Sequence, residues 1–524
     1  MSAIAGKLRH LGLHLRAAFA GPARPPLDYP FVPGDVAQLH RVRPREGVPA
    51  LDGQTWNDLL LQPWLDELTR ETSIFGKQEL YRRLRAGAAQ PGRDAQCGRV
   101  RALLADPARL EDLQRRLRPL RDADTEVAAL LYEGDCAPVP AWAGRTWPLP
   151  LALAASIAAV ALTPFAWLGV AFVLYVLIAL QMRYHERVQK WKQSVATLRM
   201  LLATCWVLGE DEALADGGFA LGREQAGRLD RALSRGAAWL PGAQEYGDWF
   251  ALANVNHYFK SMRRVFAERD FLAACYERCA VLEADVALAR HLQAAPRWCW
   301  AAASAPDALA LDGAVHPLLA GAAPLSIALD GKGAFISGQN GVGKSTFLRT
   351  LGLSLATARA FGFAYAHAAR LPDLPLYASM QNEDSLLGGE SLYIAELRRA
   401  RELLQAADSG GAAVFLIDEI FRGTNHVESV SAAAAVLDTL AARGLVLVSS
   451  HNVVLASLLA RWLDPYRIAR DAGGLTLRPG VLVETNGVAL LAGQGFAPEI
   501  SDKAARFAQW LGQRLSEPIA IPAL

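Results

Sequence analysis

The stretch ISGQNGVGKSTFLR contains residue types that together can hold a phosphate group. Gly338 and Gly343 are separated by four residues and are followed by Lys344, Ser345 and Thr346, which fits the GxxxxGK[ST] pattern completely. The backbone amides of such a loop, at the start of a helix, surround a β-phosphate. Lys344 is then expected to reach the β- and γ-phosphates, and Ser345 to place its hydroxyl on Mg²⁺.

Two later apolar runs end in side chains that suit nucleotide hydrolysis. AAVFLIDEIFRGTN is predicted to be a strand ending in Asp418 and Glu419, and GLVLVSSHN a strand ending at His451. Because the carboxyl ends of parallel strands meet at one edge of a sheet, we expect these side chains beside the glycine-rich loop. Asp418 would join the magnesium shell, Glu419 would polarise the attacking water, and His451 would contact the γ-phosphate or its water.

The sequence thus predicts an ATPase that uses ATP and Mg²⁺. The predicted catalytic residues are Lys344, Glu419 and His451, and the predicted metal ligands are Ser345 and Asp418. The residues predicted to bind the nucleotide are Gly338, Asn340, Gly341, Gly343, Lys344, Ser345 and Thr346.

The elements that must position these residues change character at about Pro306. From there, short apolar runs bounded by glycine predict an α/β domain, whereas the preceding residues show the three- and four-residue apolar spacing of amphipathic helices. The predicted fold class is α plus α/β, a helical region with an inserted hairpin followed by a P-loop ATPase domain. The predicted segments are a basic, proline-rich 1–50, helical 51–146, the hairpin 147–182, helical 183–305 and the ATPase domain 306–524.

Residues 147–182 form a block without a charged side chain. As one helix the block would measure roughly 54 Å, whereas a bilayer core is about 30 Å thick. Pro164 divides it into 148–163 and 165–182, which predicts a transmembrane hairpin of two short spans. The alternative is a buried helical pair inside a soluble domain.

Positive charge flanks the hairpin on both sides. Basic side chains occur at Arg145 before it and at Arg183, His185, Arg187 and Lys190 after it. Because cytoplasmic loops carry an excess of Lys and Arg, we expect the cytoplasmic membrane as the location, with both soluble parts facing the cytoplasm.

Overall charge and cysteine usage exclude few partners. The net charge of +2, from 54 basic and 52 acidic residues, excludes a strongly cationic nucleic-acid coat but not a local basic patch. The six cysteines are scattered without a CxxC pair, so we expect neither a disulfide framework nor a zinc site.

The segment SLYIAE, Ser391 to Glu396, resembles the part of the MutS family of DNA mismatch-repair ATPases in which a serine opens a helix. DEIFRGTN is similar to the family's DEIGRGT, SSHN to its THY, and His316-Pro317 to its RHP. The resemblance covers about 50–145 and 183–515. It implies a homodimer with composite ATP sites, in which Ser391 contacts the partner's γ-phosphate, and helical levers that couple the nucleotide to DNA.

The chain also departs from the family pattern. Only about 50 residues precede the lever-like helices, which leaves no room for the domain that reads mismatches. Phe421 stands where the family has glycine and Leu392 where it has threonine, so the contact made by Ser391 is expected to differ in detail. The apolar block has no counterpart, and it falls where the outgoing lever helix would turn back.

Three functions are compatible with these residues. The first is a membrane-anchored MutS-like ATPase that embraces DNA through phosphate contacts, without a mismatch wedge. The second is a membrane-associated ATPase scaffold that works without DNA, and the third is an ABC-type component, which the absence of an LSGGQ signature disfavours. The arginines proposed for a DNA-binding surface are Arg82, Arg83, Arg85, Arg115, Arg116 and Arg118.

Overall fold

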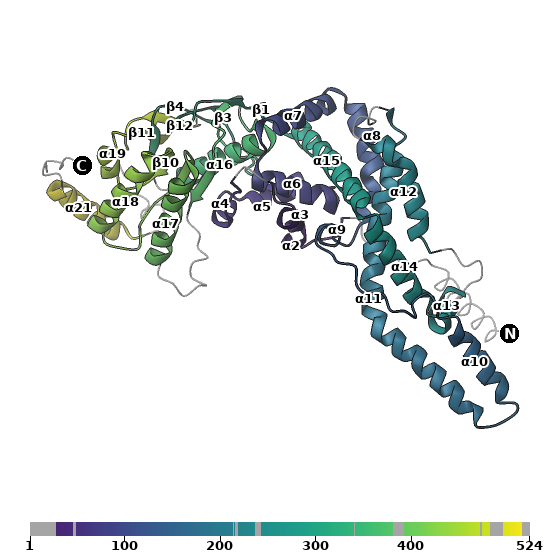
Figure 1. Ribbon diagram of the computed structural model, residues 1–524. Helices are drawn as coiled ribbons and strands as arrows, with labels where there is room; N and C mark the ends of the chain where they lie inside the picture. The colour runs from purple at the N-terminus through teal and green to yellow at the C-terminus, as the bar shows by residue number, and fades with distance from the viewer. Residues whose placement is uncertain are drawn as a thin grey trace, which may run out of the picture. The chain divides into compact units, whose positions relative to one another are not determined.

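The computed structural model describes residues 28–45, 49–212, 214, 218–235, 243–339, 341–380, 392–471, 474–482 and 496–515. The chain divides into two compact units (Figure 1). The helical unit comprises residues 1–44, 69–82 and 102–289, and the sheet unit comprises 45–68, 83–101 and 290–524. The predicted domain boundaries remain a prediction, and these units interleave in the sequence instead of following one another.

The helical unit is organised around α11 (Ala166–Leu208), one uninterrupted helix of 43 residues. No glycine or proline occurs between Val170 and Leu208, so nothing in the backbone breaks the helix there. Its other helices are α2 (Pro33–Val36), α3 (Gln38–Val42), α8 (Pro107–Leu117), η1 (Arg118–Asp122), α9 (Ala128–Tyr132), α10 (Pro148–Ala159), α12 (Phe219–Leu233), α13 (Ala243–Ala251) and α14 (Ala253–Ala267), with most of α6 (Ile74–Ala86) and α15 (Arg269–Ala294).

The apolar block folds as a helical hairpin. Helix α10 is followed by a turn that contains Pro164 and then by α11 (Figure 1). The first helix ends at Ala159, earlier than the predicted 163. The second continues past the predicted end at 182, because the residues that follow, rich in Arg, Gln, Glu and Lys, are good helix formers.

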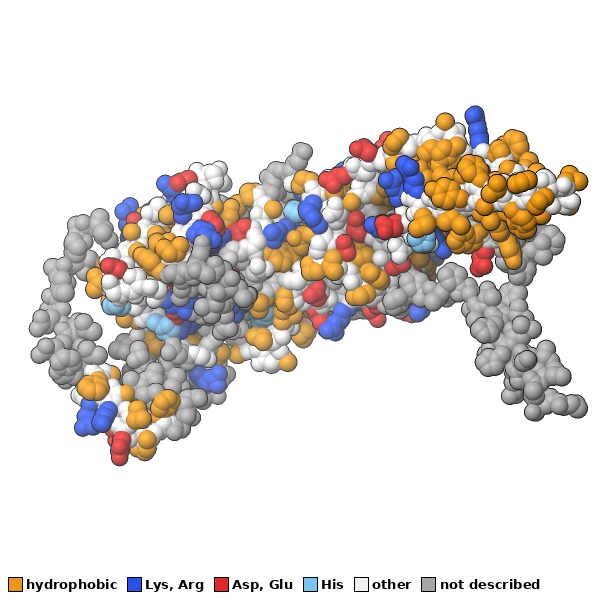
Figure 2. Space-filling view, turned by 90° about the horizontal axis from the view of Figure 1, so that it is seen from below, with side chains coloured by type: hydrophobic (Ala, Val, Ile, Leu, Met, Phe, Trp, Pro, Cys, Tyr) orange, Lys and Arg blue, Asp and Glu red, His pale blue; other side chains and the backbone are white. Residues whose placement is uncertain are grey.

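The outer surface of this hairpin is apolar and open. Among the described residues, α11 is the one helix that is long and apolar enough to cross a membrane by length and composition. Only 22% of its most apolar window is buried, so it does not have the enclosed surroundings of a core helix. Figure 2 shows hydrophobic side chains covering the visible face of the hairpin. The exposed large side chains include Leu151, Ile157, Leu162, Phe165, Leu168, Phe172 and Tyr175.

The sheet unit contains a six-stranded sheet in the order β12-β11-β5-β10-β9-β8. Its strands are β5 (Gly333–Gly338), β8 (Leu376–Ser379), β9 (Val414–Asp418), β10 (Leu445–Ser449), β11 (Leu463–Asp471) and β12 (Gly474–Pro479). All neighbouring pairs are parallel except β11 with β12. Every residue of β5, β9 and β10 is buried, as expected for parallel strands that are covered on both faces.

Helices cover the two faces of this sheet. On one face, α17 (Leu392–Gly410), α18 (His426–Ala441) and α19 (Val454–Leu458) pack against Phe415, Ile417 and Val448. On the other, α16 (Lys344–Phe361) approaches so closely that a Cβ on its Gly352 would lie 2.8 Å from the Leu416 side chain. Successive side chains of β9 therefore point to opposite faces of the sheet, and each face is covered by a helical layer.

Smaller elements complete the sheet unit. A four-stranded sheet has the order β2-β7-β3-β4, and β1 pairs with β6. These strands are β1 (Cys299–Trp300), β2 (Ala302–Ala303), β3 (Ala308–Ala314), β4 (Leu325–Asp330), β6 (Phe363–Ala364) and β7 (Ala368–Leu371). The helices are α4 (Gly53–Asp58), α5 (Leu61–Leu68), α21 (Pro498–Leu515) and the beginning of α7 (Gln90–Ala105). The α plus α/β fold class predicted from the sequence is confirmed at this level.

Candidate functional site

The glycine-rich loop connects the buried strand β5 to the first turn of α16. Gly338 ends β5, and a Cβ there would lie 2.8 Å from the Val342 side chain, so the position requires glycine. Gly341 and Gly343 have φ values of 73° and 105°, in the left-handed region. Such a backbone turns successive amides inward and ends at a helix N-terminus, which is the arrangement that binds anions.

Lys344 begins α16 and is buried, with its Nζ held by the loop itself. Nζ donates to the carbonyl oxygens of Gly338 at 3.0 Å and Gln339 at 3.4 Å. Burial lowers the pKa of Lys344, and the nearby Glu419 and Asp418 carboxylates act in the opposite direction. Ser345 and Thr346 follow in the same turn and are half-buried. The ammonium group therefore lies at the mouth of the loop.

Asp418 is the last residue of β9 and is 4% exposed. The parallel register places it opposite Ser449, the last residue of β10, whose hydroxyl donates to its Oδ1. One carboxylate oxygen is thus fixed by a neighbouring strand. This orients the side chain at the carboxyl edge of the sheet, where β10 lies between β9 and β5.

Glu419 and His451 meet across this edge. The Nε2 of His451 lies 2.7 Å from Glu419 Oε1 and 3.4 Å from Lys344 Nζ. Glu419 has a left-handed φ of 55°, and its N–H donates to the carbonyl of Ser449 at 2.9 Å. The strained turn directs the Glu419 side chain away from the strand and toward His451.

A second carboxylate supports the turn after Glu419. The backbone N–H of Arg422 donates to Glu396 Oε2 at 2.9 Å, and the Arg422 guanidinium lies 3.7 Å from Glu419 and 3.8 Å from Glu396. Burial raises the pKa of Glu396, although the backbone donors and Arg422 favour its charged form. Glu396 therefore joins α17 to the loop that carries Glu419.

These residues fit a nucleoside triphosphate with Mg²⁺. The left-handed glycines, the helix N-terminus and Lys344 provide donors and positive charge for phosphate. Asp418 and the Ser345 hydroxyl are oxygen ligands of the kind that Mg²⁺ prefers. The described residues contain no cluster of three or more His, Cys, Asp or Glu side chains that could hold a metal alone. Mg²⁺ is usually bound by one or two carboxylates together with substrate phosphates.

Most of the predicted site residues lie together in the sheet unit. Gly338, Gly341, Gly343, Lys344, Ser345 and Thr346 occupy the loop and first turn. Asp418 ends β9, Glu419 follows it directly, and His451 follows β10. Asn340 and Ser391 lie outside the described residues. Sequence reasoning gave no role to Ser449, although the serine pair in SSHN was visible, or to Glu396 as a support for the Glu419 turn.

The six arginines proposed for a DNA surface differ in their environments. Arg83 is 1% exposed and cannot contribute to a surface. Arg82 is paired with Glu79 at 2.6 Å, and Arg85 stacks on Trp56 at 5.2 Å from the ring centroid. The prediction of a surface is therefore wrong for Arg83, because its position on α6 faces the interior.

The other three arginines are on α8 and η1. Arg115 and Arg118 are exposed, and Arg116 contacts Asp112 at 2.7 Å. Arg116 also lies 3.7 Å from Asp211. Of the six, only Arg115 and Arg118 are exposed, and Arg115 has a loose contact with Asp112 at 3.9 Å.

Comparison with known proteins gives a family match for part of the sheet unit. Residues 334–464 match the MutS domain V family. The chain is 39% identical over 143 residues to the endonuclease MutS2 of Thermus thermophilus, covering 26% of this chain and 19% of that protein. It is 32% identical over 187 residues to the DNA mismatch repair protein MutS of Thermus aquaticus, covering 34% and 23%. With the DNA mismatch repair protein MutS 1 of Halobacterium salinarum it shares 27% over 290 residues, covering 49% and 33%.

The matched part spans between a fifth and a third of the length of these relatives. The domain V match begins in β5 and ends in β11, so it contains the glycine-rich loop, Asp418, Glu419 and His451. Residues 334–464 thus resemble domain V of MutS proteins, and the match includes the whole of the candidate site.

Proposed function

We propose that this chain is a dimeric MutS-type ATPase that embraces DNA and is held at a membrane by residues 147–182. The observation that carries the ATPase part is the convergence of Lys344, Glu419 and His451 at one sheet edge within the MutS domain V match. An ABC-type component has no comparable support.

In this proposal, the loop and Lys344 bind the phosphates of ATP. The buried ammonium of Lys344 exchanges its two carbonyl contacts for phosphate oxygens. Burial lowers the pKa of Lys344 because it removes water from the charged form. Negatively charged phosphate oxygens would stabilise that charged form, so the exchange is favourable. When bound, Mg²⁺ would supply positive charge against the negative charge that develops during phosphoryl transfer. Asp418, fixed by Ser449, and Ser345 would hold it.

Glu419 orients the attacking water and receives its proton. Its carboxylate is largely shielded, with 18% of the side chain exposed, and it is held between His451 and Arg422. His451 is 44% exposed, so it can exchange its Glu419 contact for one with the γ-phosphate or the water. The left-handed turn at Glu419 keeps the carboxylate at this place without a change of backbone.

Dimer formation and DNA binding are two further parts of the proposal. They rest on the family, whose relatives include proteins named for DNA mismatch repair, and on the exposed Arg115 and Arg118 of the helical unit. Ser391 would then complete the partner's ATP site. Contacts from such arginines to DNA phosphates would make binding depend on DNA structure rather than on base pairs.

The membrane part rests on the exposed apolar surface of the hairpin. Soluble monomers rarely expose a continuous apolar patch beyond a few hundred Å², whereas a lipid-facing helix is apolar on its outside. The exposed side chains run along α10 and α11, from Leu151 to Tyr175. Both soluble parts would face the cytoplasm, as the flanking arginines predict.

ATP hydrolysis by the full-length chain in lipid nanodiscs tests the DNA part. Linear duplex, single-stranded and branched DNA are each added at low and high salt. Stimulation by one form, lost at high salt, is the expected result, since phosphate contacts release counterions. Hydrolysis that ignores every DNA form would instead favour the scaffold that works without DNA. The Glu419→Gln variant measures the background in each assay.

A further inference from the structure

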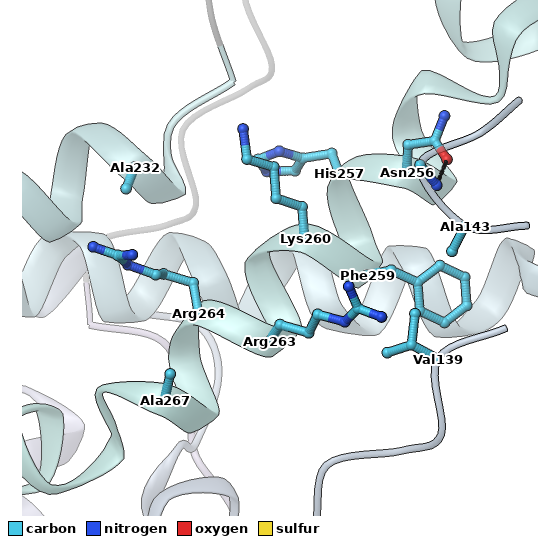
Figure 3. A pocket seen from close by; sticks show the side chains of 11 residues that line it. Val139, Ala143, Ala232, Asn256, His257, Phe259, Lys260, Arg263, Arg264 and Ala267 are labelled. Carbon is cyan, nitrogen blue, oxygen red and sulfur yellow. Dashed lines mark hydrogen bonds between the residues drawn. The ribbon is translucent and has the colours of Figure 1, made fainter. Parts of the chain in front are cut away.

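A hollow of about 740 Å³ opens on the helical unit beside α14. Three parts of the chain line it: the loop from Val139 to Gly144, Ala232 of α12, and α14 from Asn256 to Ala267 (Figure 3). It lies in a different unit from the ATP site and shares no residue with it.

The hollow is cationic. Lys260, Arg263 and Arg264 are exposed and leave neighbouring turns of α14 (Figure 3). Arg264 has a loose contact with Glu268, at 3.7 Å. Among the described residues, no carboxylate pairs with Lys260 or Arg263. The free charge of the hollow therefore suits an anion.

The hollow continues into the base of the apolar hairpin. Asn256 accepts from the N–H of Gly144 at 2.9 Å and donates to Thr146 Oγ1 at 2.5 Å. Thr146 directly precedes the apolar block. Phe259, on the same wall, belongs to the buried cluster that contains Leu153 and Val170 of the hairpin. One wall of the cationic hollow is thus packed against the hairpin itself.

Helix α13 carries exposed aromatic side chains near the end of the apolar run. Tyr246, Trp249 and Phe250 are all exposed on this short helix, and its Asp248 carbonyl accepts from Gln181 at 3.1 Å. Gln181 is at the end of the apolar run. Exposed aromatic side chains at the end of an apolar span are typical of the boundary between acyl chains and headgroups.

The hollow extends outward from this boundary. Asn254, just before it on α14, donates to Gln181 at 3.2 Å, and Ser261, beside Lys260, accepts from Trp191 at 2.8 Å. From Asn256 to Arg264 the helix rises about 12 Å. The headgroup layer is about 5–8 Å thick on each side, and long cationic side chains reach several ångströms toward it. The cations of the hollow are therefore within reach of headgroups.

Helix α11 carries further basic side chains just beyond the apolar run. Arg183, Arg187, Lys190 and Lys192 are exposed, and no described carboxylate forms an ion pair with any of them. They would draw anionic lipids toward the hairpin, while the hollow offers a bounded site.

We propose that the hollow lined by Lys260, Arg263 and Arg264 binds the phosphate-bearing headgroup of an anionic phospholipid. The inference rests on the proposed membrane anchoring. A lipid is favoured over a DNA backbone because the wall of the hollow is continuous with the apolar hairpin, so the acyl chains of the same molecule have a surface to lie against.

The test uses the full-length chain reconstituted in phosphatidylcholine that contains trace spin-labelled phosphatidylglycerol or spin-labelled phosphatidylcholine. The measured quantity is the ratio of the two labels immobilised on the protein. The native chain should prefer phosphatidylglycerol, and Lys260→Gln/Arg263→Gln should lower the ratio by up to about fivefold for each cation removed. Lys260→Arg/Arg263→Lys, which conserves charge, should keep the preference. Arg115→Gln/Arg118→Gln removes the same charge elsewhere in the helical unit and should also keep it.

Two outcomes overturn the site while leaving the membrane anchor standing. One is a native chain that is retained by vesicles but shows equal immobilisation of both labels. The other is a Lys260→Gln/Arg263→Gln variant that keeps its lipid preference but loses salt-sensitive DNA binding, which would assign the hollow to DNA. A native chain that is not retained by vesicles of either lipid would overturn the anchoring itself.

Discussion

The Nε2 of His451 lies 2.7 Å from the Oε1 of Glu419, although 32 positions separate them in the sequence. The contact exists because β9 and β10 are parallel neighbours with Asp418 opposite Ser449, so the residues that follow each strand emerge at the same edge. It places the Glu419 carboxylate against an imidazole that also lies 3.4 Å from the Lys344 ammonium. The expected effects of substituting Lys344, Glu419 and His451 follow from this arrangement.

Lys344→Ala should weaken ATP binding by about 30- to 1000-fold, because truncating one partner of a buried charge pair costs about 2–4 kcal/mol. Equilibrium binding of a fluorescent ATP analogue measures this. Lys332→Ala is the matched control, since its exposed ammonium lies 3.6 Å from Asp464 in the same unit. It should change affinity by less than about twofold. Equal affinities for the two variants would show that Lys344 does not contact phosphate.

Glu419→Gln should lower the single-turnover rate of hydrolysis by about 10²- to 10⁴-fold and leave ATP affinity nearly unchanged, because it removes the proton acceptor but keeps the shape. His451→Gln should produce a smaller decrease, since it removes the imidazole that contacts Glu419 and would contact the γ-phosphate or the water, but leaves the proton acceptor in place. Glu402→Gln, on the exposed face of α17 next to Arg399, serves as the control. A Glu419→Gln variant that hydrolyses ATP at a tenth of the native rate or faster would assign the role to another group.

Phe421→Gly should destabilise the sheet unit, although it restores the residue that the resembling family has there. Phe421 has a left-handed φ of 58°, and glycine would relieve about 1–2 kcal/mol of strain. The ring is 1% exposed and lies edge-on to Tyr393, so its removal costs about 3–5 kcal/mol. The loss of burial is therefore larger than the relief of strain, and the variant should be less stable by about 2 kcal/mol. Urea unfolding, followed by loss of binding of the ATP analogue, would show a lower midpoint, and a raised midpoint would mean that strain dominates.

Asp58 predicts a pH dependence of stability. Burial raises the pKa of this carboxyl to about 6, although it accepts from the Met380 N–H at 2.8 Å and from Gln54 at 3.0 Å. The folded state therefore binds a proton that the unfolded state releases above about pH 4. Stability from this group is present at low pH and is lost as the pH rises from about 4 to about 6, by at most about 3 kcal/mol.

Asp58→Asn should remove this part of the slope, because the amide does not titrate. Urea midpoints of both proteins at a series of pH values, compared by difference, isolate the Asp58 share from that of other carboxylates. Asp66→Asn, an exposed position bonded to Gln62, controls for loss of a charge. Parallel pH profiles for the native and Asp58→Asn proteins would contradict the raised pKa.

Phe172→Lys distinguishes a lipid-facing hairpin from a solvent-facing one. Phe172 is 67% exposed on α11, and Leu221, on α12, is 91% exposed. In water, either substitution should be almost neutral. In a bilayer, a lysine near the middle of the span costs about 2.5–3.5 kcal/mol, so Phe172→Lys should reduce the alkali-resistant membrane fraction and Leu221→Lys should not. Equal fractions for both variants would refute the membrane-embedded hairpin.

The local parts of the site were the predictable ones. The loop from Gly338 to Thr346 is contiguous, so its chemistry follows from spacing alone, and the pairing of Glu419 with His451 follows from parallel strands. The support given by Glu396 to the Arg422 backbone was not foreseen, because it depends on how α17 packs. The burial of Arg83 was not foreseen for the same reason: helical periodicity shows that faces differ, not which one meets the core.

The hairpin shows the same limit. Hydropathy located the apolar block and Pro164 located its turn, but the end of α11 could not be read from hydropathy. The helix continues for 26 residues beyond Met182, because backbone hydrogen bonding and helix propensity do not change where the apolar side chains end.

This continuity makes α11 a rod of about 64 Å, of which the first part is apolar and the rest belongs to the soluble helical unit. Each residue turns the helix by about 100°, so the direction in which Phe172 faces is locked to the direction in which Trp191 faces. Inserting two residues near Gln189 would turn one part against the other by about 200°, whereas seven residues would nearly restore the original phase. The number of residues between the hairpin and the soluble helices is therefore under a geometric constraint that their chemical character does not reveal.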